Sequence, residues 1–320
     1  MKILEYDEVD PLEVLQLNLM ALDFSLTPER AKLIRQHDNR VFPFLSLYVL
    51  IDGVVAGQVG VFRLPMVTTE GPEDVGAVWA VCTHPSFGRR GIASRLMNEA
   101  HERMRAEGLQ FSTLGTSRYR LAHPFYLKHG YRDAFSSVSF LIHREELEKH
   151  GSNLSVERAT PEQLHHTDDI YRLASVNRLG FTRRFENFVP AMVTIGEIAM
   201  GPIEEKNIWF LRDGDQLIGY FVASMAGPVL KIMDMLLLEG VNPVDAVASL
   251  AGNLPVTYIH VKSNRPSVTA SLSGIRSRIV LRDWSTFMVK PLTSEAVNSN
   301  LEDLFGIGTD RFLISWMDTT

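Results

Sequence analysis

The sequence contains a single cysteine, Cys82, among 320 residues. One thiol excludes a disulfide within the chain and a zinc site built from several cysteines. Positive charge is also in the minority, with 32 Lys and Arg against 38 Asp and Glu, so the formal net charge is −6 at pH 7. Because nucleic-acid-binding proteins carry clustered basic residues and no basic block occurs here, we expect no nucleic-acid partner. An acidic surface weakly favours cationic substrates such as amines.

Long uninterrupted apolar runs are lacking as well. The longest apolar stretch, Gly219–Leu238, is interrupted by Lys231 and Asp234 and is not expected to span a membrane. The N-terminal segment MKILEYDEVD carries acids where a secretory signal would have an apolar region. We therefore expect a cytoplasmic protein with no membrane partner, and the sequence leaves a homo-oligomer open.

The segment Val78–Met97 has the pattern of a strand, a loop and a helix. Its loop contains two glycines, two arginines and an alanine: Gly88, Arg89, Arg90, Gly91 and Ala93. Small residues let the backbone approach a ligand closely, and a helix that begins near Ile92 adds unpaired N–H groups and a positive dipole end. This combination predicts a phosphate-binding loop. The P-loop ending Gly-Lys-Ser/Thr and the three-glycine dinucleotide fingerprint are both missing.

Residues Thr83–Leu96 resemble motif A of the GNAT superfamily of N-acetyltransferases, whose loop follows the pattern Gln/Arg-x-x-Gly-x-Gly/Ala. Gly91 and Ala93 match this pattern, whereas Gly88 occupies the position of the usual Gln or Arg. The two arginines that follow Gly88 can supply the positive charge. The alternative is an ordinary turn between a strand and a helix.

A second segment, His123–Asp133, resembles the Phe-Tyr-x-x-x-Gly-Phe/Tyr signature near the end of the GNAT catalytic domain. The matching residues are Phe125, Tyr126, Gly130 and Tyr131. The resemblance implies that Tyr126 is the general acid that protonates the departing CoA thiolate. The Asn that the family usually has seven positions earlier is Tyr119 here. The alternative is that Tyr126 packs its ring on the sheet.

The resemblance also implies how acetyl-CoA, the expected co-substrate, would bind. The backbone of a strand would hydrogen-bond the pantetheine arm like an added strand, and the amides of the following loop and helix would hold the pyrophosphate. The expected contact residues, in chain order, are Val81, Cys82, Thr83, Arg89, Arg90, Gly91, Ile92, Ala93 and Ser94. The N–H of residue 82 or 83 would stabilise the oxyanion. No metal site is expected.

The group that deprotonates the amine stays open. Some GNAT members carry a Glu on the strand that corresponds to Val78–Thr83, and this strand has no carboxylate. The remaining sources are a water chain, a carboxylate from the second half, or the chain terminus at Thr320. We expect Cys82 to be a small apolar filler rather than an acylated nucleophile. Three histidines are expected to belong to the scaffold or rim: His84, His123 and His129.

The expected order of elements over residues 1 to about 145 is βααβββαβαβ. The dipeptide Asp52-Gly53 between Leu45–Ile51 and Val54–Leu64 predicts a hairpin. In the helix after the loop, apolar residues recur every four positions and predict a buried stripe: Ile92, Leu96, Ala100 and Met104. The last strand of this half is expected over Tyr131–His143.

The second half repeats the order of the first. Ser155–Leu164 matches the opening strand and helix start, and Ile208–Ser224 parallels Tyr48–Phe62 as strand, Asp-Gly turn and strand, with Gly219 corresponding to Gly57. Asp234–Leu250 occupies the position of motif A, but no Gly/Arg loop precedes its helix. The alternative is an unrelated α/β domain.

We therefore expect an α/β chain with mixed sheets and two tandem GNAT-like domains. Residues 1–147 would form the catalytic domain and residues 152–320 a degenerate second copy. This arrangement is similar to the Eis-like tandem acetyltransferases without their third, sterol-carrier-like domain. The resemblance implies an acetyl-CoA-dependent N-acetyltransferase that acylates a primary amine of a small molecule or peptide by direct attack in a ternary complex. The alternatives are a non-catalytic acyl-CoA sensor and an assembly protein.

Overall fold

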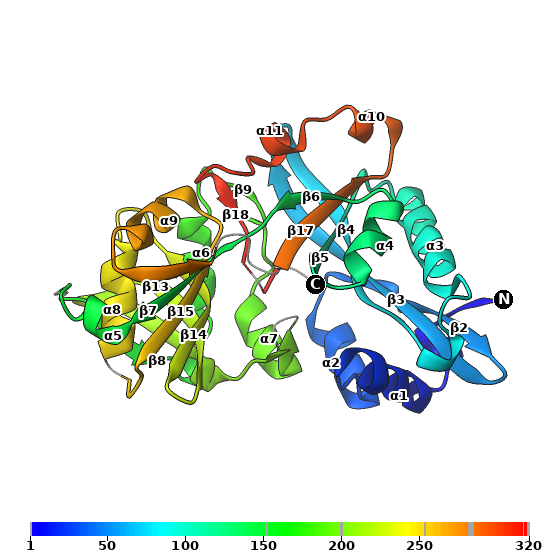
Figure 1. Cartoon of the computed structure of the whole chain (residues 1–320), viewed down its shortest axis with the longest axis horizontal. Coiled ribbons are helices and arrows are strands. Elements are labelled where there is room, and N and C mark those ends of the chain that lie inside the picture. The colour runs from blue at the N-terminus through cyan, green and yellow to red at the C-terminus, as the bar shows by residue number, and fades with distance from the viewer. Residues whose placement is uncertain are drawn as a thin grey trace.

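The computed structural model describes residues 2–150, 153–198, 201–252, 254–280, 285–315 and 317–318. They form two lobes, each built on a mixed sheet (Figure 1). The first sheet has the path β1 (Ile3–Glu5), β2 (Val41–Ile51), β3 (Val54–Thr68), β4 (Gly71–Thr83), β5 (Phe111–Ser117), β17 (Ser285–Pro291) and β6 (Arg132–Phe135). The short strands β9 (Leu179–Gly180) and β18 (Phe312–Leu313) join it through β3.

The second sheet has the path β16 (Ser277–Val280), β7 (Val138–His143), β15 (Tyr258–Ser263), β14 (Val229–Leu237), β13 (Gln216–Ala226), β12 (Ile208–Asp213) and β8 (Ser155–Arg158). A separate pair consists of β10 (Glu197–Ile198) and β11 (Gly201–Pro202). The helices are α1 (Pro11–Leu22), α2 (Pro28–His37), α3 (Ile92–Ala106), α4 (Ala122–Lys128), α5 (Arg144–Leu147), α6 (His166–Ala174), α7 (Phe188–Ile195), α8 (Pro243–Gly252), α9 (Pro266–Ser273), α10 (Ser294–Val297) and α11 (Leu301–Phe305). The predicted α/β fold class with mixed sheets is confirmed, and the two sheets agree with a division into two units.

The two sheets exchange strands. β17 lies between β5 and β6 of the first sheet, and β7 lies between β15 and β16 of the second. In Figure 1, β17 (orange) accordingly lies among the N-terminal strands. The strand expected over Tyr131–His143 is therefore divided into β6 and β7, which belong to different sheets. Phe140 and Ile142 of β7 are fully buried in the core of the second sheet.

Local patterns account for the elements around the site. The hairpin between β2 and β3 closes at Ile51 and Val54, and both turn residues, Asp52 and Gly53, have positive φ, as a type I′ turn requires. The predicted stripe on α3 is fully buried against the first sheet, together with Met97. The prediction missed His101, which also lies on this buried face.

The second lobe repeats the first at a key glycine. Gly57 on β3 pairs with Val49 of β2 and with Thr83 of β4, and Gly219 on β13 pairs in the same way with Leu211 of β12 and Leu237 of β14. Each glycine is required by packing, since an added Cβ would lie 2.6 Å from Cγ2 of Ile92 in the first lobe and 2.7 Å from a β14 carbonyl oxygen in the second. The predicted correspondence of the two glycines is therefore present in three dimensions.

Candidate active site

The edge of β4 opens beside β5. The two parallel strands pair only at Gly76–Ser112 and Ala77–Thr113, although β4 continues to Thr83. Ala80 has φ of 47° where the β3–β4 register shifts, which is a β-bulge that bends β4. In the described sheet, no β5 residue pairs with Val81, Cys82 or Thr83. Their backbone can therefore accept an extended ligand as an added strand.

The loop after β4 prepares the start of α3. The His84 Nδ1 atom accepts a hydrogen bond from the Ser86 N–H, 3.2 Å away, and Arg89 and Gly91 follow with φ of 61° and 77°. Gly91 is the residue before α3 and has no side chain to cap the helix. The first α3 residues, Ile92, Ala93 and Ser94, therefore keep N–H groups without an intrahelical acceptor. The helix start can hold an anion at this place.

The two loop glycines have different roles. A Cβ on Gly91 would meet nothing within 4 Å, so the position faces open space, but its φ of +77° is one that L-residues rarely adopt. Gly88 has φ of −54°, and an added Cβ would make only an ordinary 3.5 Å contact with the Pro85 carbonyl oxygen. The backbone at Gly88 thus tolerates a side chain. The Arg90 guanidinium lies 5.3 Å from the centre of the Phe87 ring and is exposed at the rim.

Tyr126 lies on α4 with 7% of its surface exposed, and its ring packs at 67° to that of Tyr131. Burial raises the pKa of the Tyr126 hydroxyl to about 12, with a contribution from Cys82. Burial likewise raises the pKa of the Cys82 thiol to about 12. Both groups are therefore protonated at neutral pH. Tyr126 can act as a proton donor, whereas Cys82 lacks the thiolate form that a nucleophile needs.

The histidines of this region anchor α4. The His129 Nε2 atom lies 3.2 Å from the Ser94 hydroxyl oxygen. The His123 Nε2 atom lies 2.9 Å from a carboxylate oxygen of Asp133, which also accepts a hydrogen bond from the Thr286 hydroxyl. His123 thus has a carboxylate partner, which the sequence analysis did not assign, although both residues lie in the same signature segment. These contacts fix α4 to α3, β6 and β17.

A buried polar chain behind Tyr126 was also missed by the sequence analysis. The Tyr131 hydroxyl lies 2.7 Å from the Ser112 hydroxyl and 2.9 Å from His101 Nε2. Lys290 Nζ lies 3.1 Å from His101 Nδ1. Because a protonated lysine can only donate, Nδ1 accepts and Nε2 carries the proton. These hydrogen bonds fix the Tyr131 side chain, whose ring packs against that of Tyr126.

Aromatic rings line β4 beside the bulge. The Trp79 ring stacks on Phe62 at a centroid distance of 5.2 Å, and Phe24 contacts it edge-on at 6.3 Å. The indole N–H of Trp79 is buried and has no hydrogen-bond partner among the described residues. Trp79 lies flat against Gly60, where an added Cβ would meet its Nε1 atom at 2.2 Å. The ring is therefore held in place before any ligand binds.

Two acids of the second half, which could serve as the base, already have an ion-pair or hydrogen-bond partner within the chain. Asp318 is buried and pairs with Arg184 at 2.7 Å, and Asp234 accepts a hydrogen bond from the Ser315 hydroxyl at 2.5 Å. Thr320, the other expected source of a base, lies outside the described residues.

Within the described ranges, no group of three or more His, Cys, Asp or Glu side chains could hold a metal ion. None of the described helices is long and apolar enough to cross a bilayer.

Comparison with known proteins shows that the model of the Acetyltransferase (GNAT) family matches residues 12–131. Solved structures share the fold over 92% of this chain. A probable N-acyltransferase from Enterococcus faecalis has a TM-score of 0.66 at 17% identity, and a GCN5-related N-acetyltransferase from Kribbella flavida has 0.67 at 15%, each with 73% of its own chain covered. Eis1 from Mycobacterium abscessus has a TM-score of 0.60 at 16% identity, with 75% covered. No curated protein matches.

Proposed function

Since residues 12–131 match the model of the Acetyltransferase (GNAT) family, we propose that the chain uses acetyl-CoA to acylate a primary amine of a small molecule or peptide. The observation that carries this proposal is the combination of an open β4 edge, an uncapped start of α3 and a buried, protonated Tyr126. These three features supply a site for a pantetheine arm, a site for a pyrophosphate and a proton donor.

The proposed contacts of acetyl-CoA follow the backbone. The pantetheine arm would pair with Val81–Thr83, and the pyrophosphate would lie on the amides between Arg89 and Ser94. Gly91 lets the chain turn there and leaves room for the phosphates. The exposed guanidinium groups of Arg89 and Arg90 would add positive charge at the rim.

The proposed reaction is direct transfer in a ternary complex. The backbone N–H of residue 82 or 83 donates a hydrogen bond to the thioester oxygen as it gains negative charge. Tyr126 donates its proton to the departing CoA thiolate. The amine attacks as the neutral base, and its proton leaves through water or a carboxylate of the second half. A covalent acyl-Cys82 step is disfavoured because the Cys82 thiol is buried and protonated.

We propose that residues 1–147 hold the catalytic unit and residues 152–320 a degenerate copy, with β17 and β7 exchanged between them. The start of α8, which corresponds to that of α3, offers no comparable phosphate-binding site. The Asn242 side chain accepts a hydrogen bond from the Val244 N–H at 2.9 Å, Pro243 has no N–H, and Asp245 places a negative charge in the first turn. The proposal therefore assigns one acetyl-CoA site to the chain.

Calorimetry with CoA, followed by transfer assays with acetyl-CoA and a panel of amines, tests this function. Saturable CoA binding with transfer to at least one amine supports the enzyme. Binding without any transfer would favour an acyl-CoA sensor. No CoA binding at all would favour an assembly protein.

A further inference from the structure

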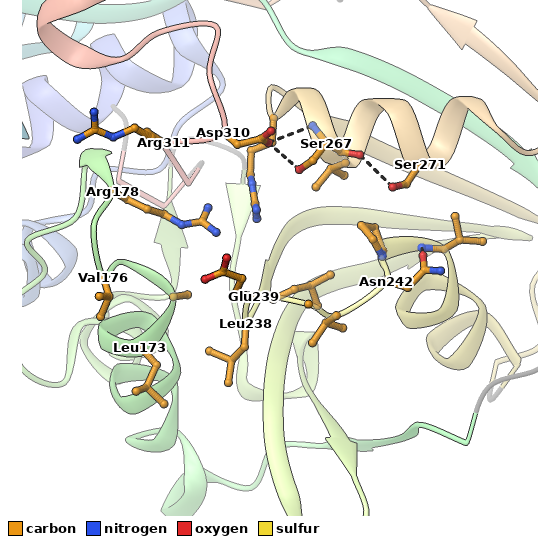
Figure 2. A pocket seen from close by; sticks show the side chains of 18 of the residues that line it. Leu173, Val176, Arg178, Leu238, Glu239, Asn242, Ser267, Ser271, Asp310 and Arg311 are labelled. Atoms are coloured by element: carbon orange, nitrogen blue, oxygen red, sulfur yellow. Dashed lines mark hydrogen bonds between the residues drawn. The ribbon is translucent and has the colours of Figure 1, made fainter.

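The second lobe contains a cavity of about 960 Å³, and none of its lining residues belongs to β4. Figure 2 shows it between the end of α6, the loop after β14, the starts of α8 and α9, and the segment that carries Asp310 and Arg311. The proposed acyl transfer uses none of its residues. A volume of this size accommodates a small organic molecule rather than a single ion.

Two half-buried arginines, Arg178 and Arg265, line this cavity. Among the described residues, neither Arg178 nor Arg265 forms an ion pair, and Nη1 of Arg178 and Nε of Arg265 are buried without a hydrogen-bond acceptor. Burial, with the positive charge of Arg178 adding to it and the charge of Asp310 opposing it, lowers the pKa of Arg265 to about 10. The two guanidinium groups thus lie close enough to repel each other. Both arginines are half-buried and line the cavity, so their remaining guanidinium N–H groups are placed to donate hydrogen bonds to an oxyanion there.

The acids around the cavity act on this pair without forming an ion pair with it among the described residues: the charge of Asp310 raises the pKa of both arginines, against the effect of burial, and the charge of Glu239 raises that of Arg178. Asp310 Oδ1 accepts hydrogen bonds from the Ser267 N–H at 3.0 Å and from its hydroxyl at 2.6 Å, and so caps the start of α9. Glu239 is exposed and points toward Arg178 from the facing wall (Figure 2). Glu239 therefore competes with a bound anion for Arg178 without forming an ion pair of its own.

The helix starts beside the cavity are occupied. Asn242 caps α8 and Asp310 caps α9, so each of these helix starts already has a side-chain acceptor. The remaining wall is mixed: polar residues such as Asn177 and Ser271 lie beside an apolar set that comprises Leu173, Val176, Leu238, Val241 and Ile275. Leu173 and Val176 are more than half exposed.

We propose that this cavity binds an amphiphilic small molecule whose oxyanion head, a carboxylate or a phosphate, is held by Arg178 and Arg265 while its apolar body covers Leu173 and Val176. The site is separate from the proposed acyl-CoA site, and its occupancy does not depend on acyl transfer.

Calorimetry with four probes tests the chemistry of the ligand: octanoate, octyl phosphate, 1-octanol and inorganic phosphate. We expect saturable binding of octanoate, octyl phosphate or both, and the stronger of the two identifies the head group. Binding of 1-octanol as tight as that of the anions, binding of inorganic phosphate as tight as that of octyl phosphate, or no binding by either amphiphile would each overturn the proposal.

Variants locate the site. Arg265→Gln should weaken binding of the better probe about tenfold or more, because a charged hydrogen bond is lost. Glu239→Gln should strengthen it several-fold, because a competing carboxylate is removed. Unchanged affinity in both variants would overturn the proposal.

A matched pair of valine substitutions tests the location of the site without changing either arginine. Val176 and Val297 are both 61% exposed, but Val297 lies on α10 and outside the cavity. Val176→Glu should abolish binding through repulsion of the anion, whereas Val297→Glu should leave it unchanged. Equal effects of the two substitutions would contradict the assignment. CoA affinity should stay at the wild-type value in both variants, which separates this site from the acyl-CoA site.

Discussion

His129 and Ser94 lie 35 positions apart in the sequence, and their side chains meet at 3.2 Å between Nε2 and the hydroxyl oxygen. The contact joins the C-terminal end of α4 to the first turn of α3. The two segments that resemble GNAT motifs are thus connected directly. The helix that carries Tyr126 is positioned by the helix whose start would hold the pyrophosphate.

Tyr126→Phe should lower kcat by about 10²–10⁴-fold and leave acetyl-CoA affinity nearly unchanged, because the hydroxyl is needed chiefly when the thiolate departs. The ring remains and keeps its packing against Tyr131. The comparison requires kcat with a good amine acceptor and the equilibrium affinity for acetyl-CoA in both forms. An unchanged kcat would remove Tyr126 from the reaction and leave it as a core aromatic.

Gly91→Val should block acetyl-CoA binding. The substitution places branched carbons in the space where the phosphates would lie and forces a β-branched residue to φ of +77°. Gly88→Val is the matched control, since Gly88 has φ of −54° and room for a Cβ. Calorimetry with acetyl-CoA, with thermal unfolding to check the fold, measures the difference. Loss of binding in Gly88→Val with normal binding in Gly91→Val would contradict the assignment of the pyrophosphate site to Gly91 and the start of α3.

Cys82→Ala should retain most of the activity, because the thiol is a buried filler beside a backbone N–H that the substitution leaves in place. Mass spectrometry after mixing the enzyme with acetyl-CoA alone should show no acylated protein. A burst of acylation that disappears in Cys82→Ala would establish a covalent intermediate instead of direct transfer.

The free energy of unfolding should fall as the pH drops from about 6.5 toward 3. Burial, with the charge of Lys290 adding to it, lowers the pKa of His101 from 6.5 to about 3 in the folded chain. Between these values the unfolded chain binds more protons, so acid favours unfolding, by at most about 1.4 kcal/mol per pH unit from this residue. Above pH 6.5 the contribution is complete.

Urea unfolding at pH 7 and pH 5 measures this effect. The loss of stability between the two pH values should be smaller in His101→Gln than in the wild type, and unaltered in His37→Gln, since His37 is exposed. Equal pH dependence in all three proteins would show that His101 is not the titrating group.

Residues 1–147 should not fold well alone. This fragment lacks β17, which separates β5 from β6, and it retains β7, whose partners β15 and β16 belong to the other half. An unpaired sheet edge and an orphan apolar strand favour aggregation. We expect the fragment to be poorly recovered by itself and improved by co-expression with residues 152–320. A monomeric fragment that unfolds cooperatively and binds CoA would contradict this expectation.

Features set by neighbouring residues could be predicted from the sequence. The Asp52-Gly53 hairpin and the buried stripe of α3 depend on turn chemistry and helical spacing, and the structure confirms both. The pairing of β7 could not be predicted, because alternating apolar residues specify a strand but not its partner. The contact of His101 with Lys290 could not be predicted either, because Lys290 lies on β17, 189 positions later, and the sequence does not specify which strands pair. The cavity at Arg178 and Arg265 likewise joins segments without a common motif.

The exchange of strands also sets an order of events during synthesis. β6 ends at Phe135, but its neighbour β17 begins only at Ser285. At a ribosomal rate of about 5–20 residues per second, roughly 8–30 s pass before the first sheet can be completed. The proposed acetyltransferase unit, although encoded first, is thus among the last parts to mature. The proposed activity would therefore require synthesis at least through the end of β17 at Pro291.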